Sequence, residues 1–280
     1  MNAWRYNFHS HTRYGDGHAD AAAMVNAAAA AKMKVIGLSE HAPLGADMDW
    51  TMASGDVESY RADLAALRES HSGGMEVLCG LECDWWPRRS ERWEEAQSRE
   101  WDYFIGSVHF VSREGMDWSI DNTPAEFEAG VQNLFGGDIR RAAAAFFEEE
   151  CEAALAGRFH ILGHFDLLKK FNKGGRYFDM DADWYHQLAM TVVEAAAQSE
   201  IIIEVNTAGL DKPVSEFYPA PWLVAECARQ GVRLTLNGDS HSPTEINRHF
   251  DTVLPQLVAL GVPELWVKHS GQEWAPVPIR

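Results

Sequence analysis

Short apolar runs that favour β-strands alternate with helix-like segments along almost the whole chain. The predicted strands cover residues 5–9, 34–38, 76–82, 103–109, 159–164, 201–206, 232–238 and 264–267. The predicted helices cover residues 19–32, 57–70, 142–155, 183–198 and 221–230. This alternation is typical of βα units around a parallel sheet. Seven or eight such units favour an α/β fold with a closed, TIM-like barrel. Because no composition break divides the chain, residues 1–280 are expected to form a single domain.

The composition and charge of the chain limit the kinds of molecule that it can bind. The 280 residues carry a formal net charge of −18, which argues against nucleic acid or an anionic membrane as the partner. No apolar run approaches the roughly 20 residues that a transmembrane helix needs. The four cysteines form no CxxC pair, so we expect a reducing compartment and a cytoplasmic location.

Histidines and carboxylates follow the predicted strands at the points where the strands end. Strand ends in a (β/α) barrel meet at one rim, and active sites lie there. His9 and His11 are two residues apart, a spacing that directs both imidazoles to the same face of a strand. Imidazole and carboxylate groups bind zinc, manganese and iron, so the pattern predicts a metal site. The strand-end residues are His9, His11, Glu40, His41, Glu82, His109, His164, Glu204, Asn206, Asp239 and His241.

The motifs around these residues resemble those of the PHP (polymerase and histidinol phosphatase) superfamily. They are His9-Ser10-His11, Ser39-Glu40-His41, Gly80-Leu81-Glu82, Ser107-Val108-His109, Gly163-His164 and Asp239-Ser240-His241, and the resemblance runs from about residue 6 to 245. Within the superfamily, the chain is most similar to the monofunctional histidinol-phosphate phosphatases. The segments that carry this narrower similarity are residues 106–110, 163–171, 204–210, 212–214 and 217–219.

The resemblance implies a distorted (β/α)7 barrel that holds two or three divalent ions, which we expect to be zinc, manganese or iron. One ion would be held by His9, His11, Glu82 and Asp239. A second would share Glu82 and add His109 and His164. A third would use His18, His41 and His241, with Asp16 as the alternative to His18 on a glycine-containing loop. Glu40 lies beside a ligand and would orient an imidazole or bind the metal itself.

The implied activity is hydrolysis of a small phosphate monoester, namely L-histidinol phosphate, in histidine biosynthesis. A hydroxide that bridges two metals, held by Glu82 and Asp239, would attack phosphorus. Candidate phosphate-clamping residues are Lys169, Lys170, Lys212, Arg88 and Arg89, and candidate residues for the ammonium or imidazole of the substrate are Asp166 and Asp211. Many relatives carry an arginine where this chain has Asp211, which bears on how the substrate is held.

Three other functions agree with parts of the pattern. A PHP-type phosphoesterase could act on another small phosphate ester, a nucleotide or an oligonucleotide end, although the net charge disfavours nucleic acid. An amidohydrolase-like barrel that cleaves C–N bonds also begins with His-x-His, but no lysine ends the third or fourth predicted strand. A metal-binding module without activity would not need so complete a ligand set.

Overall fold

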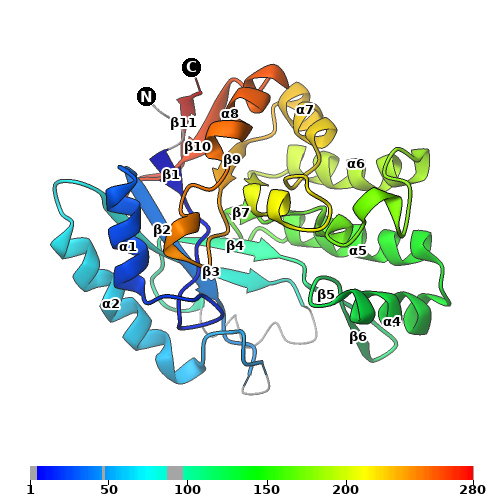
Figure 1. The fold of residues 1–280 in the computed structure, drawn as a ribbon, viewed down its shortest axis with the longest axis horizontal. Coiled ribbons are helices and arrows are strands. Elements are labelled where there is room, and N and C mark those ends of the chain that lie inside the picture. The colour runs from blue at the N-terminus through cyan, green and yellow to red at the C-terminus, as the bar shows by residue number, and fades with distance from the viewer. Residues whose placement is uncertain (1–4, 46–47, 87–96, 280) are drawn as a thin grey trace.

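Seven parallel strands form the central sheet of the computed structural model, which describes residues 5–45, 48–86 and 97–279 (Figure 1). The strands follow the order β1-β2-β3-β4-β7-β8-β9. Their bounds are β1 (Tyr6–Asn7), β2 (Val35–His41), β3 (Glu76–Asp84), β4 (Tyr103–Ser107), β7 (Ile161–Leu162), β8 (Ile202–Asn206) and β9 (Leu234–Asn237).

The first and last strands of this sheet meet just beyond their carboxyl ends. Ser10 and Ser240 form a parallel bridge there. The backbone N–H of His11 donates to the carbonyl of Ser240 at 2.8 Å, and the N–H of Ser240 donates to the carbonyl of His9 at 3.1 Å. The sheet is therefore a nearly closed barrel of seven strands, which confirms the predicted (β/α)7 fold.

The eighth predicted strand does not enter the barrel. It is β10 (Glu264–Val267), which pairs antiparallel with β11 (Ala275–Pro278). This hairpin packs Val267 and Val277 into the same apolar cluster as Tyr6 and Val35, the first residues of β1 and β2. The hairpin therefore covers the amino-terminal end of the barrel, opposite the rim that carries the polar residues.

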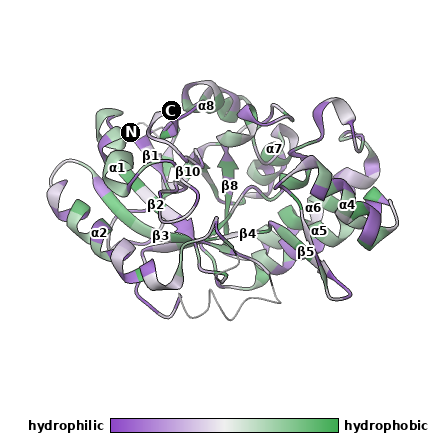
Figure 2. Cartoon of the chain, turned by 60° about the horizontal axis from the view of Figure 1, so that its bottom comes forward, coloured by the Kyte–Doolittle hydropathy of each residue, from purple (hydrophilic) through white to green (hydrophobic). Residues whose placement is uncertain are grey.

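Helices surround the sheet, with α1 and α2 on one side of the barrel and α4, α5 and α6 on the other (Figure 1). Figure 2 shows hydrophobic colouring along β8, whereas the outer helices mix hydrophobic and hydrophilic residues. The bounds are α1 (Ala21–Ala30), α2 (Val57–Ser70), α4 (Pro124–Phe135), α5 (Ile139–Leu155), α6 (Asp183–Ala197), α7 (Pro221–Gln230) and α8 (Phe250–Ala259). Among the described residues, no helix combines the length and apolar content needed to cross a bilayer.

Local sequence signals explain where several helices begin. The Asp20 carboxylate accepts from the N–H of Ala23 at 2.7 Å and caps α1. The Thr123 hydroxyl caps α4 in the same way, and Pro124 occupies the first helical position, where a missing N–H costs nothing. The sequence analysis did not predict α4 or α8. Pro255 lies inside α8 and interrupts its helical pattern, so this helix is hard to recognise from sequence.

The connections carry the shorter elements. After β4 the chain forms a hairpin of β5 (Phe110–Arg113) and β6 (Met116–Ser119), and then enters α4. Short 3₁₀ helices lie at η2 (Ser54–Asp56), η3 (Leu167–Lys169), η4 (Lys173–Gly175), η5 (Thr207–Asp211) and η6 (Pro243–Glu245).

Tyr103 fills the barrel interior below the rim. Its side chain is buried, and its hydroxyl donates to the carbonyl of Phe8 at 2.5 Å. A Cβ atom on Gly80 would lie 2.4 Å from the Tyr103 ring, so the neighbouring strand needs glycine at that position. This apolar layer separates the covered end of the barrel from the polar residues at the other end.

Candidate metal centre

The strand-end residues converge on Glu82, which lies near the end of β3. Its oxygen Oε2 faces three imidazoles at 3.0–3.3 Å, namely His9 Nε2, His11 Nε2 and His41 Nδ1. The pairing of β2 with β3 sets His41 directly beside Glu82. His9 and His11, which follow β1, are fully buried, so these contacts form out of reach of bulk solvent.

The other Glu82 oxygen faces a second pair of imidazoles. Oε1 lies 3.3 Å from His164 Nε2 and 3.8 Å from His109 Nε2. It also accepts a hydrogen bond of 2.6 Å from the Ser107 hydroxyl, which orients the carboxylate. Each oxygen of Glu82 thus faces its own group of imidazoles.

Asp239 lies on the far side of the same cluster. Its Oδ1 is 3.4 Å from His11 Nε2, 3.7 Å from His9 Nε2 and 3.6 Å from His241 Nδ1. Its other oxygen, Oδ2, accepts from the Asn206 amide at 3.2 Å. This placement agrees with a first metal position formed by His9, His11, Glu82 and Asp239.

A third group of ligand atoms gathers around Asp16. It contains His11, Asp16, His41 and His241. His241 Nε2 is 3.2 Å from Asp16 Oδ2, while His11 Nδ1 and His41 Nε2 are each 3.9 Å from Asp16 Oδ1. The ring of His11 stacks between those of His41 and His241, with centroids 4.4 Å apart on each side.

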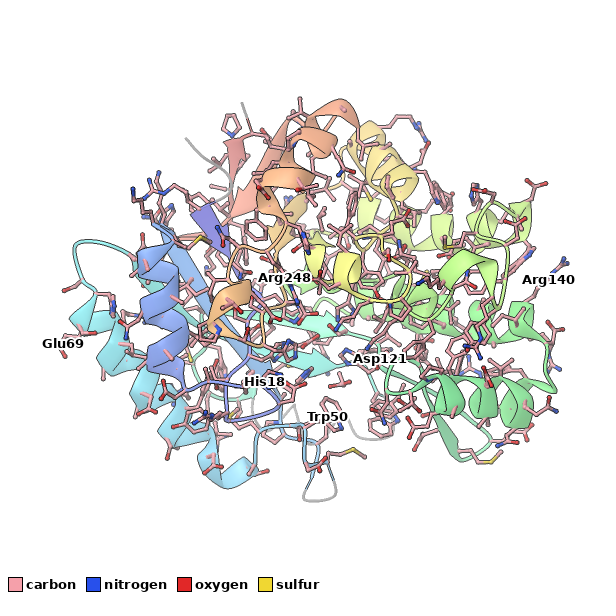
Figure 3. All side chains as sticks on the ribbon, viewed as in Figure 1. His18, Trp50, Glu69, Asp121, Arg140 and Arg248 are labelled. Atoms are coloured by element: carbon pink, nitrogen blue, oxygen red, sulfur yellow. The ribbon has the colours of Figure 1, made fainter. Side chains whose placement is uncertain are left out.

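His18 lies outside this group, in contrast to the expected third ligand set. Its side chain is exposed on the loop before α1 (Figure 3), and only its backbone N–H reaches His241, donating to the carbonyl at 2.7 Å. The N–H groups of Gly15 and Gly17 both donate to the carbonyl of Thr12. This tight turn directs Asp16 rather than His18 into the cluster.

Two buried carboxylates fix the orientation of ligand imidazoles. Nδ1 of His9 lies 2.7 Å from Glu204 Oε1, and Nδ1 of His109 lies 2.7 Å from Asp84 Oδ1. With a proton on each Nδ1, the lone pair of Nε2 points towards Glu82. Such carboxylate–histidine pairs are typical of metal sites.

The distances between the ligand atoms suit a cation bound among them better than direct contacts between those atoms. Ligands at about 2.0–2.2 Å from a divalent ion stand roughly 3–3.5 Å apart, close to the separations seen here. Several buried atoms form no hydrogen bond with any described residue: His9 Nε2, both ring nitrogens of His11, His41 Nδ1 and Asp16 Oδ1. Buried polar atoms normally have partners, so these atoms are suited to metal ligation. The nitrogen and oxygen donors suit zinc, manganese or iron.

The electrostatics of the cluster also favour positive charge. Burial lowers the pKa of His11, but neighbouring Asp239 and Glu40 raise it to about 10. Burial likewise lowers the pKa of His109, and Asp84 raises it to about 10. Burial raises the pKa of Glu82, but the adjacent imidazoles hold it well below its ordinary range. The carboxylates therefore stabilise a cation at this rim, whether a proton or a metal.

Two further residues shape the rim from outside the cluster. Glu40 Oε2 accepts from the N–H of Thr12 at 2.9 Å and from its hydroxyl at 2.5 Å, while Oε1 faces His11 Nδ1 at 3.4 Å. Glu40 therefore connects the loop after β1 to β2.

At Gly163 a Cβ atom would lie 2.4 Å from the Ser107 hydroxyl that orients Glu82, so glycine is needed for this close approach.

Some expected substrate residues have structural partners instead. Lys169 is fully buried, and its ammonium contacts Asp166 at 2.9 Å and Glu216 at 2.6 Å. The pair Lys169–Asp166 is therefore sequestered from a substrate. Asp211 contacts His249 at 2.8 Å and Arg248 at 3.6 Å.

The other expected basic residues differ in their placement. Lys170 Nζ contacts Asp121 Oδ2 at 2.9 Å, and the Lys170 side chain is partly exposed. Lys212 is half-buried and follows the 3₁₀ turn η5. Arg88 and Arg89 lie outside the described residues.

Three residues near the cluster were missed by the sequence analysis. The Trp50 ring meets His41 edge-on at 4.8 Å and His109 at 6.1 Å between centroids (Figure 3). Asp121 interacts electrostatically with His109. Arg248 donates to the backbone at Asp239. All three lie on connections after strands, where no motif distinguishes them from other loop residues.

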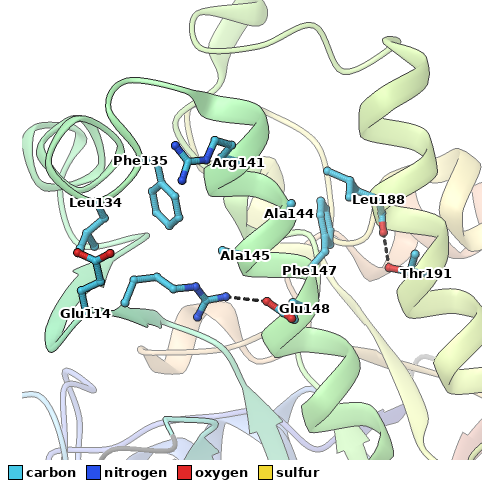
Figure 4. A pocket seen from close by; sticks show the side chains of 11 residues that line it. Glu114, Leu134, Phe135, Arg141, Ala144, Ala145, Phe147, Glu148, Leu188 and Thr191 are labelled. Carbon is cyan, nitrogen blue, oxygen red and sulfur yellow. Dashed lines mark hydrogen bonds and ion pairs between the residues drawn. The ribbon is translucent and has the colours of Figure 1, made fainter.

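A cavity of about 560 Å³ lies away from this centre, among the hairpin β5–β6, α4, α5 and α6 (Figure 4). Arg113 pairs with Glu148 at 2.7 Å beside it, and Leu134, Phe135 and Leu188 contribute its apolar surface. None of the expected ligands lines this cavity, so it does not belong to the metal centre.

The fold and the cluster together define a (β/α)7 barrel with a histidine- and carboxylate-rich centre at the strand ends. The chain belongs to the PHP domain family, because the family model matches residues 7–208. A Deinococcus radiodurans protein named "Probable histidinol-phosphatase" is 32% identical over 258 residues, 90% of this chain and 93% of that protein. A Schizosaccharomyces pombe protein of the same name is 24% identical over 221 residues, 77% of this chain and 70% of that protein.

Solved structures share the fold. A Listeria monocytogenes protein superposes with a TM-score of 0.80 at 21% identity, covering 88% of this chain and 98% of that chain. The histidinol phosphate phosphatase of Lactococcus lactis, complexed with zinc, L-histidinol and phosphate, gives a TM-score of 0.72 at 21% identity. That alignment covers 93% of this chain and 95% of the other.

Proposed function

We propose that this chain is a metal-dependent phosphomonoesterase that hydrolyses L-histidinol phosphate to L-histidinol and phosphate. The observation that carries the proposal is the convergence of five imidazoles on the two oxygens of one buried carboxylate, Glu82. The Deinococcus relative supports the substrate, and the zinc, histidinol and phosphate bound by the Lactococcus protein support the cofactor class. Histidine biosynthesis in the cytoplasm is part of the same proposal.

The ligand charges suit a phosphate dianion. Neutral imidazoles with the carboxylates of Glu82, Asp239 and Asp16 contribute three negative charges, so two or three divalent ions leave a positive surplus. When bound, such ions would supply an activated water and neutralise charge on the phosphoryl group. Glu82 would hold two metal positions at a fixed separation, and Asp239 would complete the first of them. Glu204 and Asp84 would keep the His9 and His109 lone pairs aimed at these positions.

We infer that the histidinol part of the substrate, which leaves when phosphate is released, lies on the side of the rim near His109. Asp121 is part-exposed there and pairs with Lys170. Burial raises the pKa of Asp121, but Lys170 and His109 lower it to about 2, so its carboxylate is charged at neutral pH. It is suited to accept the ammonium of histidinol. The partly exposed Trp50 ring offers a face for the imidazole.

The test is phosphate release from L-histidinol phosphate by protein loaded with zinc, manganese or iron in turn. We expect hydrolysis with at least one metal, its loss after chelation, and its return when that metal is added back. Glycerol phosphate, a nucleoside monophosphate and an oligonucleotide with a 3′ phosphate serve as competitors for the assignment. Hydrolysis of one of these in preference to histidinol phosphate would overturn the substrate, whereas an inert metal-loaded protein would overturn the activity.

A further inference from the structure

The backbone at Asp239 adopts an unfavourable conformation. Its φ angle is +48°, in the left-handed region that non-glycine residues rarely enter. The same residue places its carboxylate beside His9 and His11. Conformations of this kind persist only where surrounding contacts hold them. A contact that holds this peptide therefore also sets the position of a metal-ligating carboxylate.

Arg248 makes that contact from the connection between β9 and α8. Its Nε donates to the carbonyl of Gly238 at 2.7 Å, and its Nη2 donates to the carbonyl of Asp239. The guanidinium thus binds the carbonyl groups on both sides of the strained residue. Its side chain is only 11% exposed, and Arg248 lies near the middle of the view in Figure 3. The fork of an arginine can satisfy two such acceptors at once.

The same carbonyl of Asp239 also orients a second ligand. His241 Nδ1 lies 3.1 Å from it, which leaves His241 Nε2 to face Asp16 Oδ2 at 3.2 Å. A shift of this peptide would therefore disturb the Asp239 carboxylate and the His241 imidazole together. The two side chains belong to different groups in the cluster, so one peptide contributes to both.

Carboxylates hold the guanidinium in place. Its Nη1 faces Glu245 Oε1 at 3.3 Å and Asp211 Oδ2 at 3.6 Å. Glu245 Oε2 in turn accepts from the N–H of His241 at 2.8 Å. The carbonyl of Arg248 accepts from the Thr207 hydroxyl at 2.8 Å. Nε and Nη2 donate to backbone carbonyls, and two carboxylates balance the charge of the guanidinium, so Arg248 is arranged to hold the backbone rather than to bind a phosphate.

We propose that Arg248 is a positioning residue that clamps the left-handed peptide at Asp239 and so presents Asp239 and His241 to the metal centre. The inference rests on the metal centre of the proposed function, but not on the identity of the substrate. Asp211, which takes the place of an expected base, has a role in this arrangement because its carboxylate braces the clamp.

The test compares Arg248→Met with Arg248→Lys and a matched control. Arg68→Met is the control, because Arg68 also donates through Nε to a backbone carbonyl, that of Val77 at 2.8 Å, and pairs with a carboxylate, that of Asp102. It does so on α2, away from the rim. Zinc affinity is measured by competition with a chromophoric chelator, and folding is checked by circular dichroism of the metal-free proteins.

We expect Arg248→Met to bind zinc about 10- to 100-fold more weakly, the range found when a group that orients a metal ligand is lost. Arg248→Lys should recover part of this affinity, and Arg68→Met should bind zinc like the wild type. At saturating zinc, Arg248→Met should lower kcat more than it raises KM.

Wild-type zinc affinity in folded Arg248→Met would overturn the proposal, as would a rise in KM alone, which would make Arg248 a phosphate ligand. An equal loss in Arg68→Met would also overturn it, by showing a general effect on stability. Because zinc binding needs no substrate, a wild type that binds zinc but leaves histidinol phosphate intact refutes only the proposed function.

Discussion

Replacing Glu204 with glutamine tests whether a residue that touches no metal position controls metal binding. Glu204 is fully buried in the middle of β8. Its Oε1 accepts from His9 Nδ1 at 2.7 Å and from the Asn237 amide at 2.9 Å. Its Oε2 accepts from the N–H of His164 at 3.0 Å and from the Asn206 amide at 3.0 Å. All four neighbours donate, so both oxygens must act as acceptors.

A glutamine cannot reproduce this pattern in either orientation. Its NH₂ group would face two donors, on the side of His9 or on the side of His164. A hydrogen bond to a charged group contributes about 1.5–3 kcal/mol, so losing the one to His9 or the one to the N–H of His164 should cost about that much. Since about 1.4 kcal/mol corresponds to a factor of ten, we expect zinc to bind roughly 10- to 100-fold more weakly.

The assay is chelator competition for zinc with wild type, Glu204→Gln and the control Glu150→Gln. Glu150 is also fully buried, and neither of its carboxyl oxygens bonds to a described residue. Burial raises the pKa of Glu150 well above its ordinary range, which favours the neutral acid, and glutamine has nearly the same shape as that neutral acid. We expect unchanged zinc affinity for Glu150→Gln. Wild-type affinity in Glu204→Gln, or an equal loss in both variants, would show that Glu204 does not orient His9 for metal binding.

Three further predictions concern the loop after β1, the close contact between Gly163 and Ser107, and the cap of α1. Asp16→Ala should lower the number of zinc ions bound per chain, whereas His18→Ala should leave it unchanged, because only Asp16 joins the group; elemental analysis distinguishes the two. Gly163→Ala should destabilise the fold by about 1–3 kcal/mol in urea unfolding, because its Cβ would press on Ser107, and an unchanged midpoint would contradict this. Asp20→Ala should cost about 1 kcal/mol through loss of the α1 cap, whereas Asp20→Asn should retain most of it.

The barrel and its rim were predictable because strand order and strand ends leave local signals. The motif His9-Ser10-His11 ends the first strand, and the residues that end later strands meet it in space because the strands are parallel. The strand ends alone thus placed Glu82 at the same rim as His9, and the family resemblance added that the two share one metal position.

Other features depend on contacts that no local pattern encodes. The choice between Asp16 and His18 depends on how two glycine N–H groups share the carbonyl of Thr12. A lysine is usually a solvent-exposed cation, but tertiary packing buries Lys169 against Asp166. Arg248 reaches Asp239 only because the chain folds back after β9.

The partner of strand β10 could not be predicted from a local pattern either. The segment 264–267 has the apolar pattern of a barrel strand, but Ser10 and Ser240 already close the barrel. The segment therefore pairs with β11 and covers the opposite end of the barrel. A local pattern identifies a strand but does not specify its partner.

We propose that Glu82 joins separate metal positions at the rim of the barrel. Elemental analysis of zinc-loaded, gel-filtered wild type and Glu82→Gln tests this most directly. We expect at least two zinc ions per wild-type chain and a loss of more than one in the folded variant, because an amide cannot supply two anionic oxygens. Fewer than two ions in the wild type, or the full number in Glu82→Gln, would show that Glu82 does not join two metal positions.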